Sequence, residues 1–195
     1  MLLSASDPDD YLAADPVIDC DHTAVATLAQ ALRRDHPGET AFARAAFEYV
    51  RDQVGHSMDV QDPRVTLAAS DTLQEGVGLC FSKAHLLTAL LRAQGIPAGL
   101  CYQRLTDDGT AFALHGLIAV RLDGAWHRQD PRGNKPGVDA QFSLSQERLA
   151  WPVFPALGEC DYPQVFVRPH PAVVAVLTET TNMLDLCRVG LPTGL

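Results

Sequence analysis

The chain has few basic side chains and no long apolar run. Its 195 residues include 15 Lys and Arg against 24 Asp and Glu, a formal net charge of −9, and no Lys/Arg cluster offsets that charge. Such a surface repels phosphate backbones and anionic lipid, so neither nucleic acid nor a membrane surface is an expected partner. No apolar segment approaches the roughly 20 residues of a membrane span. The N-terminal stretch MLLSASDPDDY lacks a basic region, and we do not expect it to be a secretory signal.

Paired cysteines are also missing. The chain has 5 cysteines, an odd number, widely spaced and without a C-x-x-C pair: Cys20, Cys80, Cys101, Cys160 and Cys187. This pattern argues against a disulfide framework and against a zinc cluster, and we expect a reducing, cytoplasmic location. The length suits one domain over residues 1–195, and 47% hydrophobic with 20% charged residues is ordinary for a globular protein.

Residues 71–95 contain a cysteine at the start of a strongly helical pattern. The turn-forming residues 76–79 precede Cys80, and Gly95 and Pro97 end the pattern. Apolar residues repeat along it at helical spacing: Ala84, Leu86, Leu87, Leu90 and Leu91. Unpaired N–H groups and the helix dipole at such a position favour thiolate over thiol, which makes Cys80 a candidate nucleophile. The alternative is a small buried hydrophobic residue.

Patterns elsewhere predict helices before this segment and strands after it. Apolar periodicity predicts helices over residues 23–34, 40–54 and 173–187, with a short capped helix over 143–149. Alternation and turn residues predict strands over 98–105, 112–122 and 125–130. The intervening residues 56–70 are interpreted as loop, in which we expect His56 to be exposed, with polar lining of a site as the alternative. The expected class is α+β, a helix layer packed on an antiparallel meander.

The last predicted hairpin supplies partners for the cysteine. With residues 123–124 as a two-residue turn, Val120 faces His127. His115 is then a diagonal neighbour of Asp130 on one side of the sheet, within reach of a hydrogen bond, and His127 points to the other side. A thiol nucleophile needs a base and a group that orients the base. Taken singly, the alternatives are a core histidine and a turn carboxylate before proline.

An acyl-transfer site also needs donors for the oxyanion of its tetrahedral intermediate. The backbone N–H of Cys80 is one natural donor. Gln74, six residues upstream, is a second candidate, and a solvated loop residue is the equal alternative. His85 lies about 140° around the helix from Cys80 and cannot turn back to the sulfur.

Three stretches together resemble the transglutaminase-like superfamily of papain-type cysteine enzymes. They are GVGLCFSKAHLLTALLRAQGIPAGLCYQRL, LHGLIAVRLDGAWHRQD and PRGNK. The resemblance, and within it that to bacterial transglutaminase-like cysteine proteases, implies Cys80 as nucleophile, His115 as base and Asp130 as orienting acid. It implies N-terminal helices and a cysteine helix packed on an antiparallel sheet. The core would span about 40–135, followed by a wrapping segment and helix over 136–195. No metal or organic cofactor would be needed.

Two departures from the family pattern alter the expected pocket wall. Phe81 follows the cysteine where a polar residue is common, and Gly116 rather than an aromatic residue comes after the histidine. Trp126, in the D-G-x-W motif, is a third candidate for that wall. The expected function is cysteine-dependent acyl transfer, hydrolysing a peptide, protein or small amide substrate through a Cys80 thioacyl intermediate. The alternatives are transamidation, with an amine in place of water, and a non-catalytic binding module that retains the fold.

Overall fold

The computed structural model describes residues 2–4 and 6–195. The helices are α1 (Thr23–Asp35), α2 (Glu39–Gln53), α3 (Ser57–Val60), α4 (Ala69–Glu75), α5 (Cys80–Arg92), α6 (Pro171–Glu179) and α7 (Met183–Val189), with 3-10 turns η1 (Pro8–Leu12) and η2 (Pro155–Leu157). The strands are β1 (Leu3–Ser4), β2 (Gly55–His56), β3 (Val77–Gly78), β4 (Ala98–Thr106), β5 (Phe112–Leu122), β6 (Ala125–Gln129), β7 (Cys160–Asp161) and β8 (Gln164–Val165).

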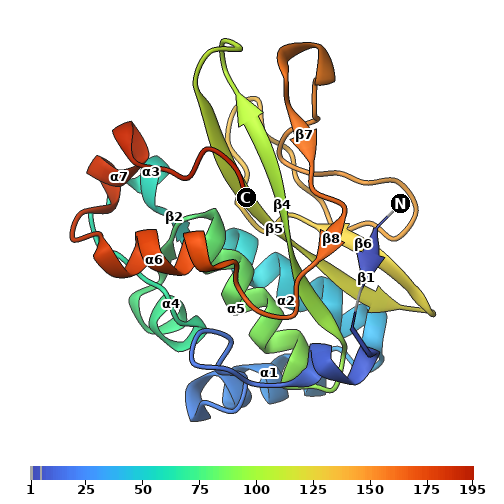
Figure 1. The fold of residues 1–195 in the computed structure, drawn as a ribbon. Helices are drawn as coiled ribbons and strands as arrows, with labels where there is room; N and C mark the ends of the chain where they lie inside the picture. Colours follow the sequence, from blue (N-terminus) through green and yellow to red (C-terminus); the bar gives the residue numbers. More distant parts are fainter. Residues whose placement is uncertain (1, 5) are drawn as a thin grey trace.

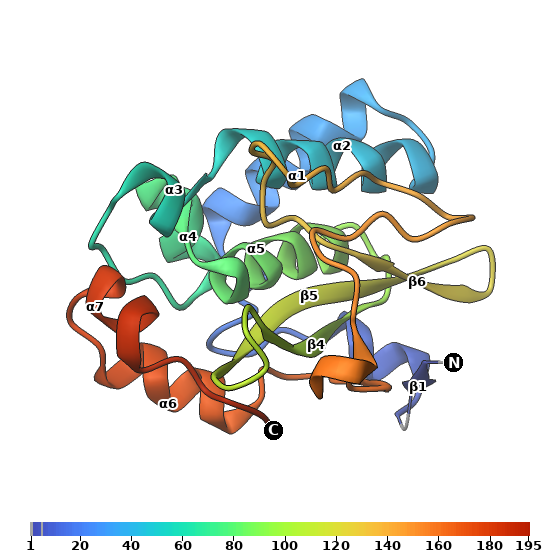
Figure 2. The ribbon, with the colours of Figure 1, turned by 90° about the horizontal axis from the view of Figure 1, so that it is seen from above.

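A four-stranded antiparallel sheet in the order β6-β5-β4-β7 forms one layer. Helices α1, α2, α4 and α5 lie on one side of it, with α5 nearest the sheet (Figures 1 and 2). The N-terminal segment and β8 lie toward the other side, where Tyr11 and Val165 form a smaller apolar cluster with residues of β4 and β5. This architecture confirms the α+β expectation.

Helix α5 is enclosed along its whole length, because all 13 of its residues are buried. Its sequence predicts only one broad apolar face, yet the polar residues on the other side are also inside. Buried polar groups need hydrogen-bond partners. Ser82 donates to the carbonyl of Thr66 at 2.6 Å. His85 Nδ1 lies 2.9 Å from the carbonyl of Leu67. Arg92 at the far end donates to the carbonyls of Ala13, Ala98 and Val167.

The hairpin register agrees with the prediction. Leu122 pairs with Ala125 and Val120 with His127. Asp123 and Gly124 both have positive φ, 50° and 78°, as a two-residue type I′ turn requires. The ladder ends at the pair Ile118–Gln129, so β6 stops just before Asp130.

Three predicted segments differ in the structure. The stretch 143–149 is not helical, because the Gln129 side chain bonds both backbone groups of Ser143 and holds the chain beside β6. The predicted helix 173–187 is two helices, since Asn182 caps a new start by accepting from Leu184 N at 3.0 Å. The loop assigned to 56–70 contains α3 and the start of α4, both too short to give a periodic signal.

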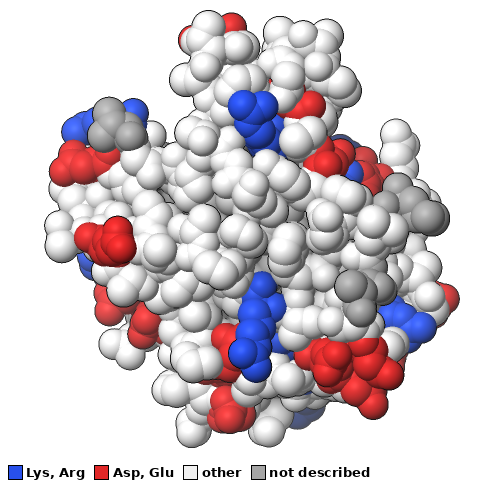
Figure 3. Space-filling view, in the orientation of Figure 1, with Lys and Arg blue, Asp and Glu red and all other residues white. Residues whose placement is uncertain are grey.

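Charged side chains are dispersed on the face that Figure 3 presents. Lys and Arg groups stand apart there, and acidic groups gather along the lower rim. Among the helices of the described part of the chain, none combines the length and the hydropathy that crossing a bilayer requires.

Phe81 and Gly116 join α5 to β5 by direct packing. A Cβ built on Gly116 would lie 2.5 Å from Phe81 Cδ1 and 3.3 Å from Phe81 Cα. The phenyl ring therefore fills the space that any side chain at residue 116 would need. The two departures from the family pattern are thus one compensated packing change.

This contact predicts coupled stability effects. Gly116→Ala alone should lower the free energy of unfolding by about 1–3 kcal/mol, because it overpacks the interface. In a Phe81→Leu background the same change should cost clearly less, since the clashing ring atoms are gone. Urea titrations of the four proteins measure the coupling, and additive costs would contradict the packing argument.

Candidate active site

A short strand and a tight turn bring Cys80 to the first position of α5. Helix α4 ends at Gly76, whose φ of 65° is left-handed, and β3 then leads into the helix. Gly78 admits no side chain, because a Cβ there would lie 2.9 Å from Ser82 Cβ. Cys80 has 6% of its surface exposed.

His115 and Asp130 meet as the hairpin register predicts. His115 Nε2 lies 2.8 Å from Asp130 Oδ2, and the Asp130 side chain is fully buried. The same carboxylate accepts the backbone N–H of Ala150 at 3.0 Å and that of Arg132 at 3.1 Å. These bonds fix the carboxylate, which in turn orients the imidazole. Because Nε2 is engaged, Nδ1 is the ring nitrogen left for the thiol.

The electrostatics of the group favour a charged imidazole. Burial alone would lower the pKa of His115. The charges of Asp130 and Cys80 and their hydrogen bonds outweigh it and raise the pKa to about 10. Burial would raise the pKa of Asp130, but His115 and the two backbone donors lower it below its usual range. The structure therefore brings the Cys80 side chain, a positively charged imidazole and a carboxylate together.

One aromatic and one basic side chain lie beside this group, and neither belongs to a periodic pattern in the sequence. The Trp151 ring packs edge-to-face on His115, with centroids 5.0 Å apart. The guanidinium of Arg132 lies over the same indole at 5.2 Å and pairs with both carboxylate oxygens of Asp59. Only residue type, an aromatic and a basic residue beside prolines, could have pointed to them.

His56 is buried, contrary to the exposed loop position expected for it. It has 8% of its surface exposed, because β2 pairs in parallel with β3 and sets His56 opposite Gly78. Burial and then the neighbouring Arg132 lower the pKa of His56 to about 3. A second, neutral imidazole therefore lies next to the first.

The other predicted site residues lie elsewhere. Gln74 is exposed on α4, outside the buried group around Cys80. Phe81 and Gly116 are in the core and pack on each other, so they line no open pocket. The Trp126 ring lies 4.8 Å from that of Tyr11, in the apolar cluster formed with the N-terminal segment.

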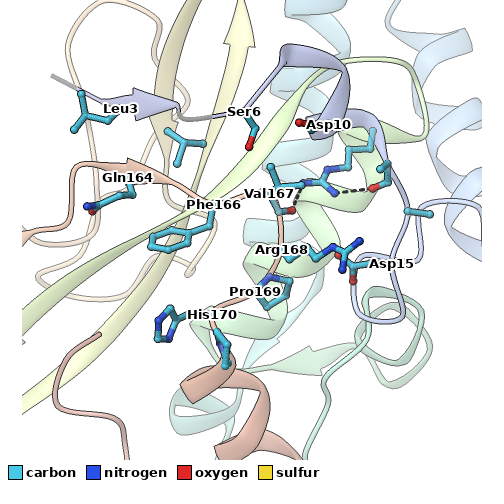
Figure 4. A pocket seen from close by; sticks show the side chains of 15 residues that line it. Leu3, Ser6, Asp10, Asp15, Gln164, Phe166, Val167, Arg168, Pro169 and His170 are labelled. Atoms are coloured by element: carbon cyan, nitrogen blue, oxygen red, sulfur yellow. Dashed lines mark hydrogen bonds between the residues drawn. The ribbon is translucent and has the colours of Figure 1, made fainter.

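A cavity in another part of the molecule is separate from this group. It measures about 840 Å³ and lies at the C-terminal end of α5, between the N-terminal segment and residues 164–171. Figure 4 shows Asp15, Phe166, Arg168 and His170 around it, and none of Cys80, His115 and Asp130 lines it.

Within the described part of the chain, no three His, Cys, Asp or Glu side chains are grouped as metal ligands. All five cysteines are free thiols.

Comparison with known proteins identifies the family of the chain. The family model described as "Transglutaminase-like superfamily" matches residues 26–131. The chain belongs to this superfamily. No curated protein matches it in sequence.

Solved structures share the superfamily fold. A candidate cysteine protease from Cytophaga hutchinsonii is 20% identical with a TM-score of 0.50, over 66% of this chain and 43% of that one. The periplasmic domain of TgpA from Pseudomonas aeruginosa is 22% identical with a TM-score of 0.48, over 65% of this chain and 48% of that one. The chain thus spans less than half the length of either structure.

The bond between His115 and Asp130 predicts a measurable shift. Asp130→Asn removes the negative charge but keeps the size, so the pKa of His115 should fall from about 10 toward or below its usual 6.5. NMR titration of the imidazole signals of the seven histidines measures it, with His115→Gln identifying the signal of His115 by its loss. An unchanged His115 titration would show that Asp130 does not control the charge.

Proposed function

We propose that the chain is a cysteine acyl-transfer enzyme that hydrolyses a peptide or amide bond. The observation that carries the proposal is the arrangement of three side chains. Cys80, at the start of α5, neighbours His115, and His115 in turn bonds to the buried Asp130. A thiol at a helix N-terminus beside a protonated imidazole is an activated nucleophile. Membership of the superfamily supports the reaction class.

The geometry allows the following sequence of steps. The Cys80 sulfur attacks the carbonyl carbon, and the C=O electron pair moves to oxygen, toward the free N–H at the start of α5. His115 then gives its Nδ1 proton to the leaving nitrogen as the C–N bond breaks, which leaves a thioester. A water molecule that has lost a proton to His115 attacks the thioester carbon, and the C–S bond breaks to release the acid and restore the Cys80 thiolate beside the protonated imidazole. Asp130 keeps the imidazole oriented and stabilises its charge throughout.

The proposed triad predicts how activity responds to substitution. Against a mixed library of peptides and small amides, Cys80→Ala should abolish turnover. Asp130→Asn should lower kcat/KM by about 10–10³, less than in serine triads because the imidazole is already charged. His127→Gln is the matched control, since strand register sets it on the opposite side of the hairpin, and it should retain near wild-type activity.

The result that contradicts the proposal is specific. Activity that survives Cys80→Ala would exclude a thiol nucleophile. Loss of activity in His127→Gln with none in Asp130→Asn would reject the triad. A wild-type protein that turns over nothing and whose Cys80 reacts with iodoacetamide no faster than free cysteine would favour a non-catalytic binding module.

A separate prediction distinguishes hydrolysis from transamidation. Both reactions pass through the same Cys80 thioester, so only the acceptor distinguishes them. With a labelled primary amine present at millimolar concentration, the acyl product should remain predominantly the free acid. Mass spectrometry of the products measures the ratio, and predominant amide formation would assign the chain as a transamidase.

A further inference from the structure

His56 presents an unusual ring for a buried histidine. Its Nδ1 is shielded from solvent and has no hydrogen-bond partner among the described residues. Most buried polar atoms are paired, and one that is not needs a reason. The ring is also close enough to the catalytic group for His115 to contribute to its titration.

The nearby acid cannot be its partner, because cations already occupy it. Asp59 Oδ1 accepts from Arg132 Nη2 at 2.9 Å and from Lys135 Nζ at 3.2 Å, and its Oδ2 accepts from Arg132 Nη1. The neighbouring Lys83 and His115 further disfavour a positive charge on the ring. A neutral imidazole keeps one N–H, and in the Nδ1–H tautomer that donor has no acceptor within the protein.

The position of His56 beside the segment that leads to Cys80 relates this donor to the reaction. Strand pairing sets His56 directly across from Gly78, two residues before Cys80. The oxygen of an attacked carbonyl must lie near the N–H at the start of α5, and a single backbone donor leaves room for a second. Gln74, the donor expected from spacing, is exposed on α4. Neutral imidazoles act as such electrophiles in other enzymes, where a positive ring would be too costly.

We propose that His56 donates its Nδ1–H to the carbonyl oxygen of the substrate, as the second oxyanion donor beside the Cys80 N–H. The inference rests on the acyl transfer proposed above. As the C–S bond forms, the carbonyl electron pair moves onto oxygen and both hydrogen bonds strengthen without proton transfer. When the C=O bond re-forms, the leaving group departs and the two donors are unchanged.

The test compares two reactions of one thiol. p-Nitrophenyl acetate acylates Cys80 through an oxyanion, whereas iodoacetamide alkylates it at a saturated carbon and forms none. His56→Leu and His56→Asn are nearly equal in shape, but only the amide can donate. His56→Leu should lower the acylation rate about 10²-fold, the typical cost of one lost oxyanion donor. It should leave alkylation within about threefold. His56→Asn should be acylated at least tenfold faster than His56→Leu.

Each other result overturns the inference. Equal losses in both reactions would make His56 a support for the thiol, and an unchanged acylation rate in His56→Leu would remove it from the reaction. Equal acylation rates in His56→Leu and His56→Asn would exclude hydrogen-bond donation. If His56→Leu fails to fold by circular dichroism, His56→Ala takes its place. Failure of the proposed function is recognised separately, because the wild-type protein would then be alkylated at Cys80 but not acylated.

Discussion

The full burial of α5 is the constraint on which the rest of the structure depends. Enclosing a helix with polar residues on several sides is costly unless most of them find hydrogen-bond partners, and in α5 Thr88 Oγ1 has none. Ser82, Lys83 and Arg92 therefore bind carbonyls from segments far apart in the chain. Lys83 Nζ donates to Arg51 O at 3.3 Å and to Val54 O, at the C-terminal end of α2. The helix that carries the thiol is thus held along its length, which fixes Cys80 relative to the sheet.

The bond between His115 and Asp130, which outweighs the effect of burial on both pKa values, sets the pH window of the site. The pKa of His115 is raised to about 10 in the folded chain, above its unfolded value near 6.5. Its contribution to stability is therefore complete below the unfolded pKa and is lost as pH rises through about 10. Asp130 has the opposite sign: its pKa is lowered, so its contribution is present above the usual carboxyl range and is lost on acidification. The charged pair is therefore maintained across neutral pH.

The sequence allowed the geometry of the reacting groups to be predicted because each depends on local rules. A two-residue turn at Asp123 fixes strand parity, and parity alone brings His115 and Asp130 together. A glycine-rich turn before an apolar helix likewise predicts the position of Cys80. The surrounding groups follow no such rule. His56 is buried by a two-residue strand pair, and Trp151 arrives from an irregular segment. Gln74 is a candidate donor only by its distance along the chain from Cys80, but it lies on α4, where it is exposed.

The surroundings of His115 have a further consequence for substrate preference. Phe81 fills the space over Gly116, so the residue after the histidine cannot form the aromatic wall that the family pattern implies. Trp151 supplies an aromatic ring against His115 instead, from a segment held by the bond of Ala150 to Asp130. That segment lies beyond residues 26–131, which the family model matches. Cys80, His115 and Asp130 therefore lie within the region that the family model matches, whereas Trp151 against His115 lies outside it. The proposed reaction class rests on the matched region, and a substrate preference set by the Trp151 ring would not follow from it.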